Sequence, residues 1–354
     1  MNLTKSDNVL PFCSIVMVNF NGIKYLRAFF NSILALNYPK NMIEIIMVDN
    51  GSADKSIEFV NNNYPEVIVI TNINNFSKAL NIVVDKSKGD FIAFLNNDME
   101  VDKRWLIELI EMVQKYPEAG CIGGKILFHD KKTINSVGHE KIGAYYFQDK
   151  GFQEKDLGQY DRLREVDGIC GGAILWRREC LDNIGPFDED YEMYFEDVDM
   201  AYRCKEKNWR MYYTPKSVAY HKFHGTSSDE LCYFLCNRNR FLFLARHIPD
   251  YLPKSILTSH LYCNSQFEFL RQCIPITMLK LLEFHGLAKF KRIVPEIFNK
   301  LDGFLSAEDL LKTIYAFELM YKSNKSTICI YDHALIPWLR DIPALAGGRD
   351  LKRK

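Results

Sequence analysis

The chain has 354 residues, of which 47% are hydrophobic and 25% are charged, an ordinary balance for a folded protein of one large domain or two smaller ones. Its 45 basic residues equal its 45 acidic residues, so net charge gives no support for a nucleic-acid partner. No apolar run is long enough to span a bilayer. The ten cysteines form no metal-type CxxC pair and no apolar leader follows Met1, so we expect reduced thiols in a cytoplasmic protein.

Strands and helices alternate from Pro11 to Asp98. We expect strands over residues 12–18, 43–48, 67–71 and 91–95, with helices over residues 22–36, 52–62 and 77–86 between them. The second and fourth of these strands are unbroken apolar runs, which is typical of parallel strands covered on both faces. The alternation predicts a doubly wound α/β domain with a mostly parallel sheet.

The pattern is less regular after Asp98. We expect a helix over residues 105–115, strands over 121–128 and 167–176, and a strand end at 217–220. Residues 129–165 are polar and are predicted to form a variable excursion. Gly171 and Gly172 allow the backbone to come close to a ligand, although a tight turn or a bulge explains such glycines equally well.

A second region begins near residue 229, where aromatic residues recur at helical spacing among lysines and arginines. We therefore predict two domains, a catalytic domain over residues 11–228 and a helical C-terminal region over residues 229–354. The helical region can complete the core as a cap, form an acceptor-side lid, or rest on a membrane surface.

Polar and acidic residues follow two of the expected strands. Asp49 ends one strand, and Asn96, Asn97 and Asp98 follow another. Ligands of open α/β sheets bind at the carboxyl ends of the strands, so these side chains should share one crevice. Taken alone, Asp49 can cap its own turn or accept hydrogen bonds from a nucleotide. The Asn-Asn-Asp group can form a plain turn or hold a Mg²⁺ ion together with a diphosphate.

Two later segments add further candidates. Glu196 and Asp197 open a predicted helix, where the helix dipole favours negative charge and where a crevice-facing carboxylate can act as a general base. His221 and His224 follow a strand, and neutral imidazole is a good ligand for ions such as Mn²⁺. A single histidine is more often a core residue, so neither feature decides the function alone.

The order of these motifs resembles the family-2 inverting glycosyltransferases, which have the GT-A fold. The segments that carry the resemblance in the first half are residues 18–22, 48–52, 72–81 and 89–98. Those in the second half are residues 171–178, 184–189, 196–199 and His221, and they look most like the rhamnosyltransferase-type branch. The resemblance covers residues 11–245.

The resemblance implies a donor side and a metal. Asp49 would contact the nucleotide base, with Asn19 and Asn21 lining the same pocket. Asn81, Asn96 and Asn97 would complete the donor side. Asn96 replaces the first acid of the family's DxD motif, so Asp98 would carry the contact to Mg²⁺ or Mn²⁺. His221 matches the downstream metal-binding histidine, with His224 as the alternative.

The resemblance also implies a mechanism. Asp197 matches the catalytic base, which removes the acceptor proton while the hydroxyl attacks the anomeric carbon and inverts it. Gly171, Gly172, Glu196 and Asp199 would lie on the acceptor side. The implied donor is a nucleotide-diphosphate sugar carrying rhamnose or another hexose. The implied acceptor is a glycan or a polyprenol-linked glycan, with peripheral contact to the cytoplasmic face of a membrane.

Three other classes compete with this interpretation. A nucleotidyltransferase would carry a Gly-rich loop with Arg or Lys after the first strand, which Asn19-Phe20-Asn21-Gly22 lacks. A Rossmann dehydrogenase would carry G-x-G-x-x-G there. A non-catalytic subunit that binds sugar nucleotides or glycans would keep the fold, but the intact Asp98, Asp197 and His221 argue against it.

Overall fold

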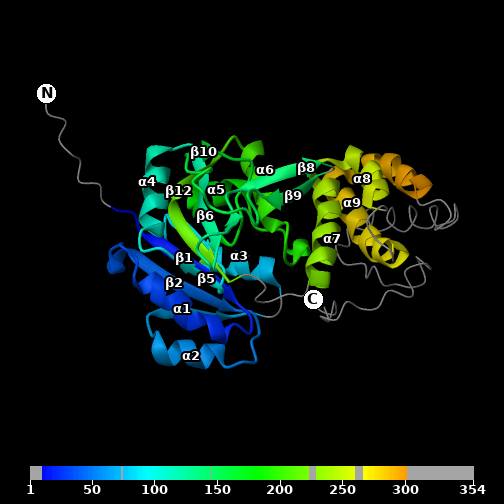
Figure 1. The fold of residues 1–354 in the computed structure, drawn as a ribbon. Helices are drawn as coiled ribbons and strands as arrows, with labels where there is room; N and C mark the ends of the chain where they lie inside the picture. Colours follow the sequence, from blue (N-terminus) through cyan, green and yellow to red (C-terminus); the bar gives the residue numbers. More distant parts are fainter. Residues whose placement is uncertain (1–9, 73–74, 144, 223–228, 260–265, 301–354) are drawn as a thin grey trace. The chain divides into compact units, whose positions relative to one another are not determined.

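The computed structural model describes residues 10–72, 75–143, 145–222, 229–259 and 266–300, and Figure 1 shows the arrangement of the elements. The chain divides after Asp229 into two units, one built on a sheet and one helical. The division falls near the change in sequence texture. The roles predicted for the two regions stay predictions. His224 lies outside the described residues.

Four parallel strands form one half of the main sheet, in the order β4-β1-β2-β3. They are β1 (Cys13–Asn19), β2 (Ile43–Asp49), β3 (Val67–Thr71) and β4 (Phe91–Leu95), linked by α1 (Ile23–Leu34), α2 (Ser56–Asn63) and α3 (Phe76–Lys86). Alternate residues of each strand face opposite sides of the sheet. Ile15 and Met17 thus join one core while Val16 joins the other, which explains the unbroken apolar runs.

The other half of the sheet is mixed. β11 (Ala173–Arg177) runs antiparallel between β4 and β6 (Ala119–Phe128), and β12 (Arg210–His221) lies parallel to β6. Two short strands, β5 (Met99–Val101) and β10 (Arg164–Glu165), pair with β12. The strand predicted over residues 167–176 therefore begins only at Ala173, where pairing with Leu95 starts. β12 is longer than predicted. A register shift between Thr214 and Val218 interrupts the alternation of side chains along the strand, so the sequence pattern indicated only its end.

Helices cover both faces of the sheet. The core on one face includes buried residues of α1, α2 and α4 (Trp105–Lys115). The core on the other face includes buried residues of α3, α5 (Arg178–Ile184) and α6 (Glu196–Glu206). This two-layered coverage confirms the predicted α/β architecture.

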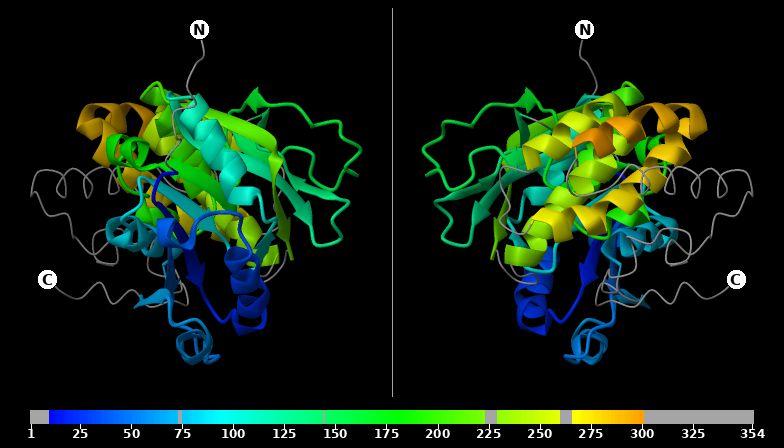
Figure 2. Two further views of the ribbon diagram at one scale, coloured as in Figure 1. Left: turned by 90° about the vertical axis from the view of Figure 1, so that its left-hand side faces the viewer. Right: turned by 90° about the vertical axis from the view of Figure 1, so that its right-hand side faces the viewer.

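Residues 129–165 contain more regular structure than predicted. They include β7 (Ile134–Ser136) and a hairpin of β8 (His139–Gly143) and β9 (Tyr146–Asp149), which project to one side of the sheet unit in Figure 2. The hairpin strands are largely exposed or half-buried, so they carry no apolar alternation that a sequence pattern can reveal.

The second unit is helical where it is described. It contains α7 (Asp229–His247, its first residue at the division), the 3₁₀ turn η3 (Pro249–Tyr251), α8 (Leu252–Ser259) and α9 (Gln266–Lys300), with a break in α9 at Gly286. Buried residues of α9 such as Met278, Leu281 and Phe290 give this unit an apolar interior. Within the described ranges, no helix combines the length and the apolar character that crossing a bilayer requires.

Candidate active site

Three polar side chains at the ends of β1, β2 and β4 form a buried chain of hydrogen bonds. Asn97 Nδ2 donates to Asn19 Oδ1 at 2.9 Å, and Asn19 Nδ2 donates to Asp49 Oδ2 at 2.9 Å. All three are almost fully buried, with Asn19 at 0% exposure. The strand ends therefore meet in one crevice, as the parallel arrangement requires.

Asp49 uses its other oxygen to shape the loop after β2. Oδ1 accepts hydrogen bonds from the backbone N–H groups of Gly51 and Ser52, at 3.2 and 2.8 Å. Ser52 Oγ accepts in turn from Asn21 N at 2.8 Å. Asp49 is 1% exposed, and its buried carboxylate holds the loop after β2 in shape. Its contact with a base stays a prediction.

The same loop explains where α2 begins. The predicted helix starts at Ser52, but in the structure Ser52 joins the crevice network and α2 starts at Ser56. Asp54 accepts hydrogen bonds from Ile23 N at 2.8 Å and Ser56 N at 3.1 Å. One carboxylate thus ties the beginnings of α1 and α2 together beside the crevice.

Asp98 and His221 come together from the end of β4 and the end of β12. His221 Nε2 lies 3.3 Å from Asp98 Oδ2, and His221 Nδ1 lies 2.9 Å from Asn135 Oδ1 on β7. If the Asn135 amide oxygen accepts from Nδ1, a neutral His221 presents its Nε2 lone pair toward the carboxylate. A proton or a divalent cation between Nε2 and Asp98 Oδ2 satisfies this arrangement. The pair is therefore compatible with a divalent cation, with Asn135 orienting the imidazole.

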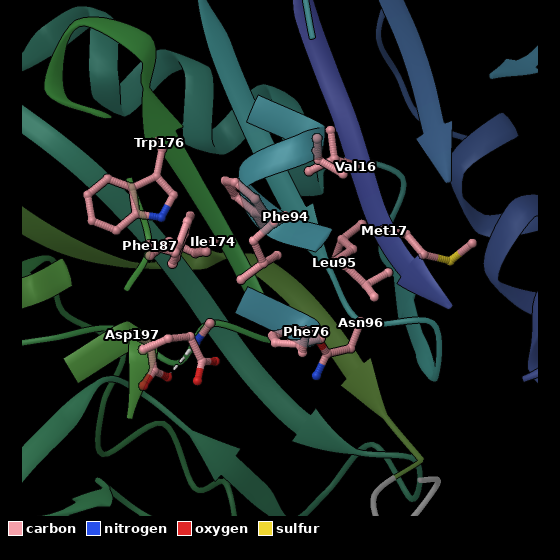
Figure 3. A pocket seen from close by; sticks show the side chains of 15 residues that line it. Val16, Met17, Phe76, Phe94, Leu95, Asn96, Ile174, Trp176, Phe187 and Asp197 are labelled. Atoms are coloured by element: carbon pink, nitrogen blue, oxygen red, sulfur yellow. Dashed lines mark hydrogen bonds between the residues drawn. The ribbon is translucent and has the colours of Figure 1, made fainter. Parts of the chain in front are cut away.

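Asp197 lies in the first turn of α6, as predicted. Its Oδ2 accepts a hydrogen bond from Gly171 N at 3.0 Å, and its Oδ1 accepts one from Val198 N at 2.8 Å. Figure 3 shows Asp197 at one end of a pocket whose walls include Phe94, Ile174 and other apolar residues. The carboxylate is thus held by backbone donors at the edge of an apolar cavity.

Glu196 lies beside Asp197 but in a different electrostatic state. Burial, together with the neighbouring Asp197 charge, raises the pKa of Glu196 to about 8. Its Oε2 is buried and has no hydrogen-bond partner. Glu196 is therefore mostly protonated at neutral pH, which leaves Asp197 as the acid of this pair that is suited to accept a proton.

Gly171 and Gly172 allow close packing beside Asp197, and Asp199 forms a buried ion pair further along α6; their contacts with an acceptor stay predictions. A Cβ on Gly171 would approach Asp197 Cβ to 3.3 Å, and a Cβ on Gly172 would approach the Met99 side chain to 2.8 Å. The absence of side chains lets this loop pack closely. Asp199 is 0% exposed and pairs with Arg203 at 2.7 Å, one turn along α6.

Arg203 anchors α6. Its guanidinium pairs with Asp199 and donates to the backbone oxygens of Ile184 and Pro186, at 2.8 and 2.9 Å. We expect Arg203→Met to lower the free energy of unfolding by about 3–5 kcal/mol, because it leaves the Asp199 charge buried and unpaired. Urea unfolding measures the change.

Arg210→Met is the matched control for that measurement. Arg210 and Glu165 form an ion pair at 3.5 Å in which both side chains are more than half exposed, so its loss should hardly change stability. Equal midpoints for the Arg203 variant and the wild type would show that the buried pair does not hold α6.

Asn81 is not brought into the crevice network. Its Oδ1 accepts from Phe187 N at 2.8 Å, and its Nδ2 donates to Phe187 O at 2.9 Å. The amide thus tethers α3 to the segment before α6. Asn96, in contrast, lines the pocket next to Asp197, and its backbone N–H donates to Gly172 O at 2.9 Å. Donor contacts of both asparagines stay predictions.

Three polar residues near the site come from the stretch predicted to be a variable excursion. Besides Asn135, these are His139 and Asp149, which face each other across β8 and β9. One ligand-type atom from each of His139, Asp149 and Cys170 lies within 4.8 Å of the others. The sequence signal was weak, since one histidine after Gly138 and one later aspartate form no motif.

The fold and the site define a class of protein, an α/β protein whose polar and acidic side chains gather at the ends of parallel strands. Residues 14–185 match the family described as Glycosyl transferase family 2, so this part of the chain belongs to that family. The match confirms the family predicted from the motifs and supports sugar transfer from a nucleotide-sugar donor.

Known proteins agree with this assignment. The chain is 25% identical over 270 residues to an N-acetylglucosaminyl-diphospho-decaprenol L-rhamnosyltransferase of Mycobacterium tuberculosis, covering 68% of this chain and 85% of the relative. That similarity supports the predicted rhamnosyltransferase-like branch.

Solved structures share the fold. GalNAc-T7 with UDP, GalNAc and Mn²⁺ has a TM-score of 0.56 and 15% identity, over 89% of this chain and 58% of that chain. S. aureus TarS 1-349 in complex with UDP-GlcNAc has a TM-score of 0.52 and 13% identity, over 87% of this chain and 91% of that chain. At such low identity these similarities concern the fold alone.

Proposed function

We propose that the protein is an inverting glycosyltransferase that moves rhamnose or another hexose from a nucleotide-diphosphate sugar to a hydroxyl group of a glycan or a lipid-linked glycan. The observation that carries this proposal is the convergence of two separate groups at one edge of the sheet. The Asp98–His221 pair is suited to a cation, and Asp197 is held by backbone donors at the mouth of a pocket. A cation at the Asp98–His221 pair would stabilise the departing diphosphate, and Asp197 would accept the proton of the attacking hydroxyl.

The donor would lie over the ends of β1, β2 and β4. Asn19, Asp49 and Asn97 hold one another and so fix the floor of the nucleotide side. Gly22 supports this arrangement, because a Cβ there would overlap the side-chain amide of Asn97 and the amide oxygen of Asn19. Asn21 and the exposed Phe20 would line the base pocket.

Asp98 and His221 would hold a Mg²⁺ or Mn²⁺ ion. When bound, such an ion neutralises charge on the diphosphate and makes it a better leaving group. Asn135 keeps the tautomer of His221 that presents a lone pair. The donor set of one carboxylate and one imidazole suits either ion, with phosphate oxygens and water filling the remaining positions.

Asp197 would act as the general base. It takes the proton of the acceptor hydroxyl as the oxygen bonds to the anomeric carbon, while the bond to the diphosphate oxygen breaks on the opposite face. One displacement inverts the anomeric configuration. The protonated Glu196 can donate a hydrogen bond to the acceptor and cannot compete for its proton at neutral pH.

A polyprenol-linked acceptor is supported by the M. tuberculosis relative, whose name specifies a decaprenol-linked substrate. With such an acceptor, the enzyme would act at the cytoplasmic face of a membrane. The helical unit would then contact the acceptor or the lipid surface. A non-catalytic sugar-nucleotide or glycan-binding subunit is the alternative, and turnover separates the two.

The test is donor turnover by the full chain with a panel of dTDP-, UDP- and GDP-sugars and lipid-linked acceptors, with Mg²⁺ or Mn²⁺ against EDTA. We expect release of one nucleoside diphosphate that depends on both metal and acceptor, and a product of inverted anomeric configuration by NMR. Donor binding without turnover would instead establish the binding subunit, and a product of retained configuration would contradict the single displacement.

A further inference from the structure

The imidazole of His139 lies between two carboxylates behind the predicted base. Its Nε2 is 3.5 Å from Asp197 Oδ2 and 3.7 Å from Asp149 Oδ1, and its side chain is only 9% exposed. Among the residues that the structure describes, no other basic side chain comes within ion-pair distance of Asp197. His139 is therefore the group whose charge bears most directly on the base.

Strand pairing puts His139 in this position. His139 and Asp149 are direct partners across the β8–β9 hairpin, so their side chains project from the same face. Gly138 precedes the histidine with φ of +116°, a conformation that favours glycine. The backbone on either side is fixed, because His139 N donates to Gly168 O and Lys150 N donates to Gly138 O, both at 2.8 Å. The ring is thus placed by the backbone of a built hairpin.

The surroundings of the ring are acidic and poorly solvated. Burial raises the pKa of Asp149, while a charged His139 nearby lowers it. Burial also raises the pKa of the Cys170 thiol well above its usual value. The titratable groups that face the ring or its two carboxylates are Asp149, Cys170, Glu196, Asp197 and His221. The ring is thus placed among acidic groups, two of which face its Nε2 directly.

We propose that His139 is a positioning residue for Asp197, and that Asp149 in turn holds the His139 ring. The ring faces the Asp197 carboxylate through Nε2 and keeps it directed before the acceptor attacks. When Asp197 receives the acceptor proton, the negative charge leaves with the nucleoside diphosphate, and the His139 ring stays between Asp197 and Asp149. The proton passes only from the acceptor oxygen to Asp197, so His139 and Asp149 change no covalent bonds. This inference rests on the proposed role of Asp197 as the base.

The test compares pH–rate profiles of the full-length wild type, His139→Gln, Asp149→Asn and Cys170→Ser. We expect His139→Gln to lower kcat about 10- to 100-fold and leave the donor KM unchanged. Its pH–rate profile should change as well, because the Asp197 carboxylate loses the imidazole that faces it. Asp149→Asn should change the profile in the same direction by less. Cys170→Ser should keep the wild-type profile, since burial raises the pKa of the Cys170 thiol and serine replaces one uncharged group by another.

A His139→Gln profile that superimposes on the wild type would overturn the inference. An equal loss in Cys170→Ser would overturn it too, because that result identifies the His139, Asp149 and Cys170 donors as a metal-binding set. If His139→Gln does not fold, His139→Ala with added imidazole tests the same positioning role. Imidazole should restore kcat and the wild-type pH–rate profile, and no response would contradict the proposal.

Failure of the underlying function is distinguishable. If Asp197→Asn transfers sugar as the wild type does, the base assignment fails whatever His139 does. If Asp197→Asn is inactive while His139→Gln keeps the wild-type profile, only the positioning role fails.

Discussion

Replacing Asp197 with asparagine is expected to lower kcat for sugar transfer by about 10³-fold, because the amide cannot accept the acceptor proton. The donor KM should change little. Asparagine keeps the size of the side chain, and its amide oxygen can still accept the Gly171 N–H hydrogen bond that the carboxylate accepts at 3.0 Å. Steady-state kinetics with the donor identified in the panel measures both constants, and calorimetric donor binding shows whether the site is intact.

Asp182→Asn is the matched control for this experiment, since Asp182 is an exposed acid on α5 outside the crevice. It should retain wild-type kcat. Glu196→Gln gives the second comparison, because Glu196 is already mostly protonated at neutral pH and should lose much less activity than Asp197→Asn. A larger loss of kcat in Glu196→Gln than in Asp197→Asn would identify Glu196, and not Asp197, as the base.

Loss of the cation site is expected to be nearly as costly. Asp98→Asn should lower kcat/KM by about 100-fold or more and raise the Mn²⁺ concentration needed for half-maximal activity, because the carboxylate supplies the negative charge of the Asp98–His221 pair. EDTA should reduce the wild type to a similar rate. Titration of Mn²⁺ followed by electron paramagnetic resonance measures binding without relying on turnover.

A graded series makes this prediction sharper. Asn135→Ala should weaken metal binding about 10- to 100-fold, since it removes only the partner that orients His221. His129→Gln is the matched control, because His129 is a largely exposed histidine paired with Glu100 outside the cation pair. Unchanged Mn²⁺ affinity in Asp98→Asn would place the cation elsewhere.

Much of the first unit could be predicted from the sequence because its signals are local. Unbroken apolar runs with polar ends mark β2 and β4, and the carboxyl ends of parallel strands share an edge. That rule was enough to predict that Asp49 and Asn97 share one edge, the family resemblance added Asn19, and the structure joins the three by hydrogen bonds. The motif order was enough to predict the family.

No such local signal marks the hairpin of β8 and β9 in the sequence. β8 and β9 bury little, so neither an apolar period nor a motif marks them, and the pairing of His139 with Asp149 arises from strand register. Asn135 lies on the buried strand β7, and its role was hidden because its contact with His221 spans 86 positions of the chain.

The sequence by itself determined the family, the sheet and the identity of the acids, because apolar periodicity and motif order are written in neighbouring residues. The tertiary structure decided what each acid contacts. It ties Asp49 into its own loop, pairs Asp199 with Arg203, protonates Glu196 by burial, and leaves Asp197 at the pocket with His139 behind it. Charge state and orientation depend on neighbours brought from distant segments, and only the packed chain specifies those neighbours.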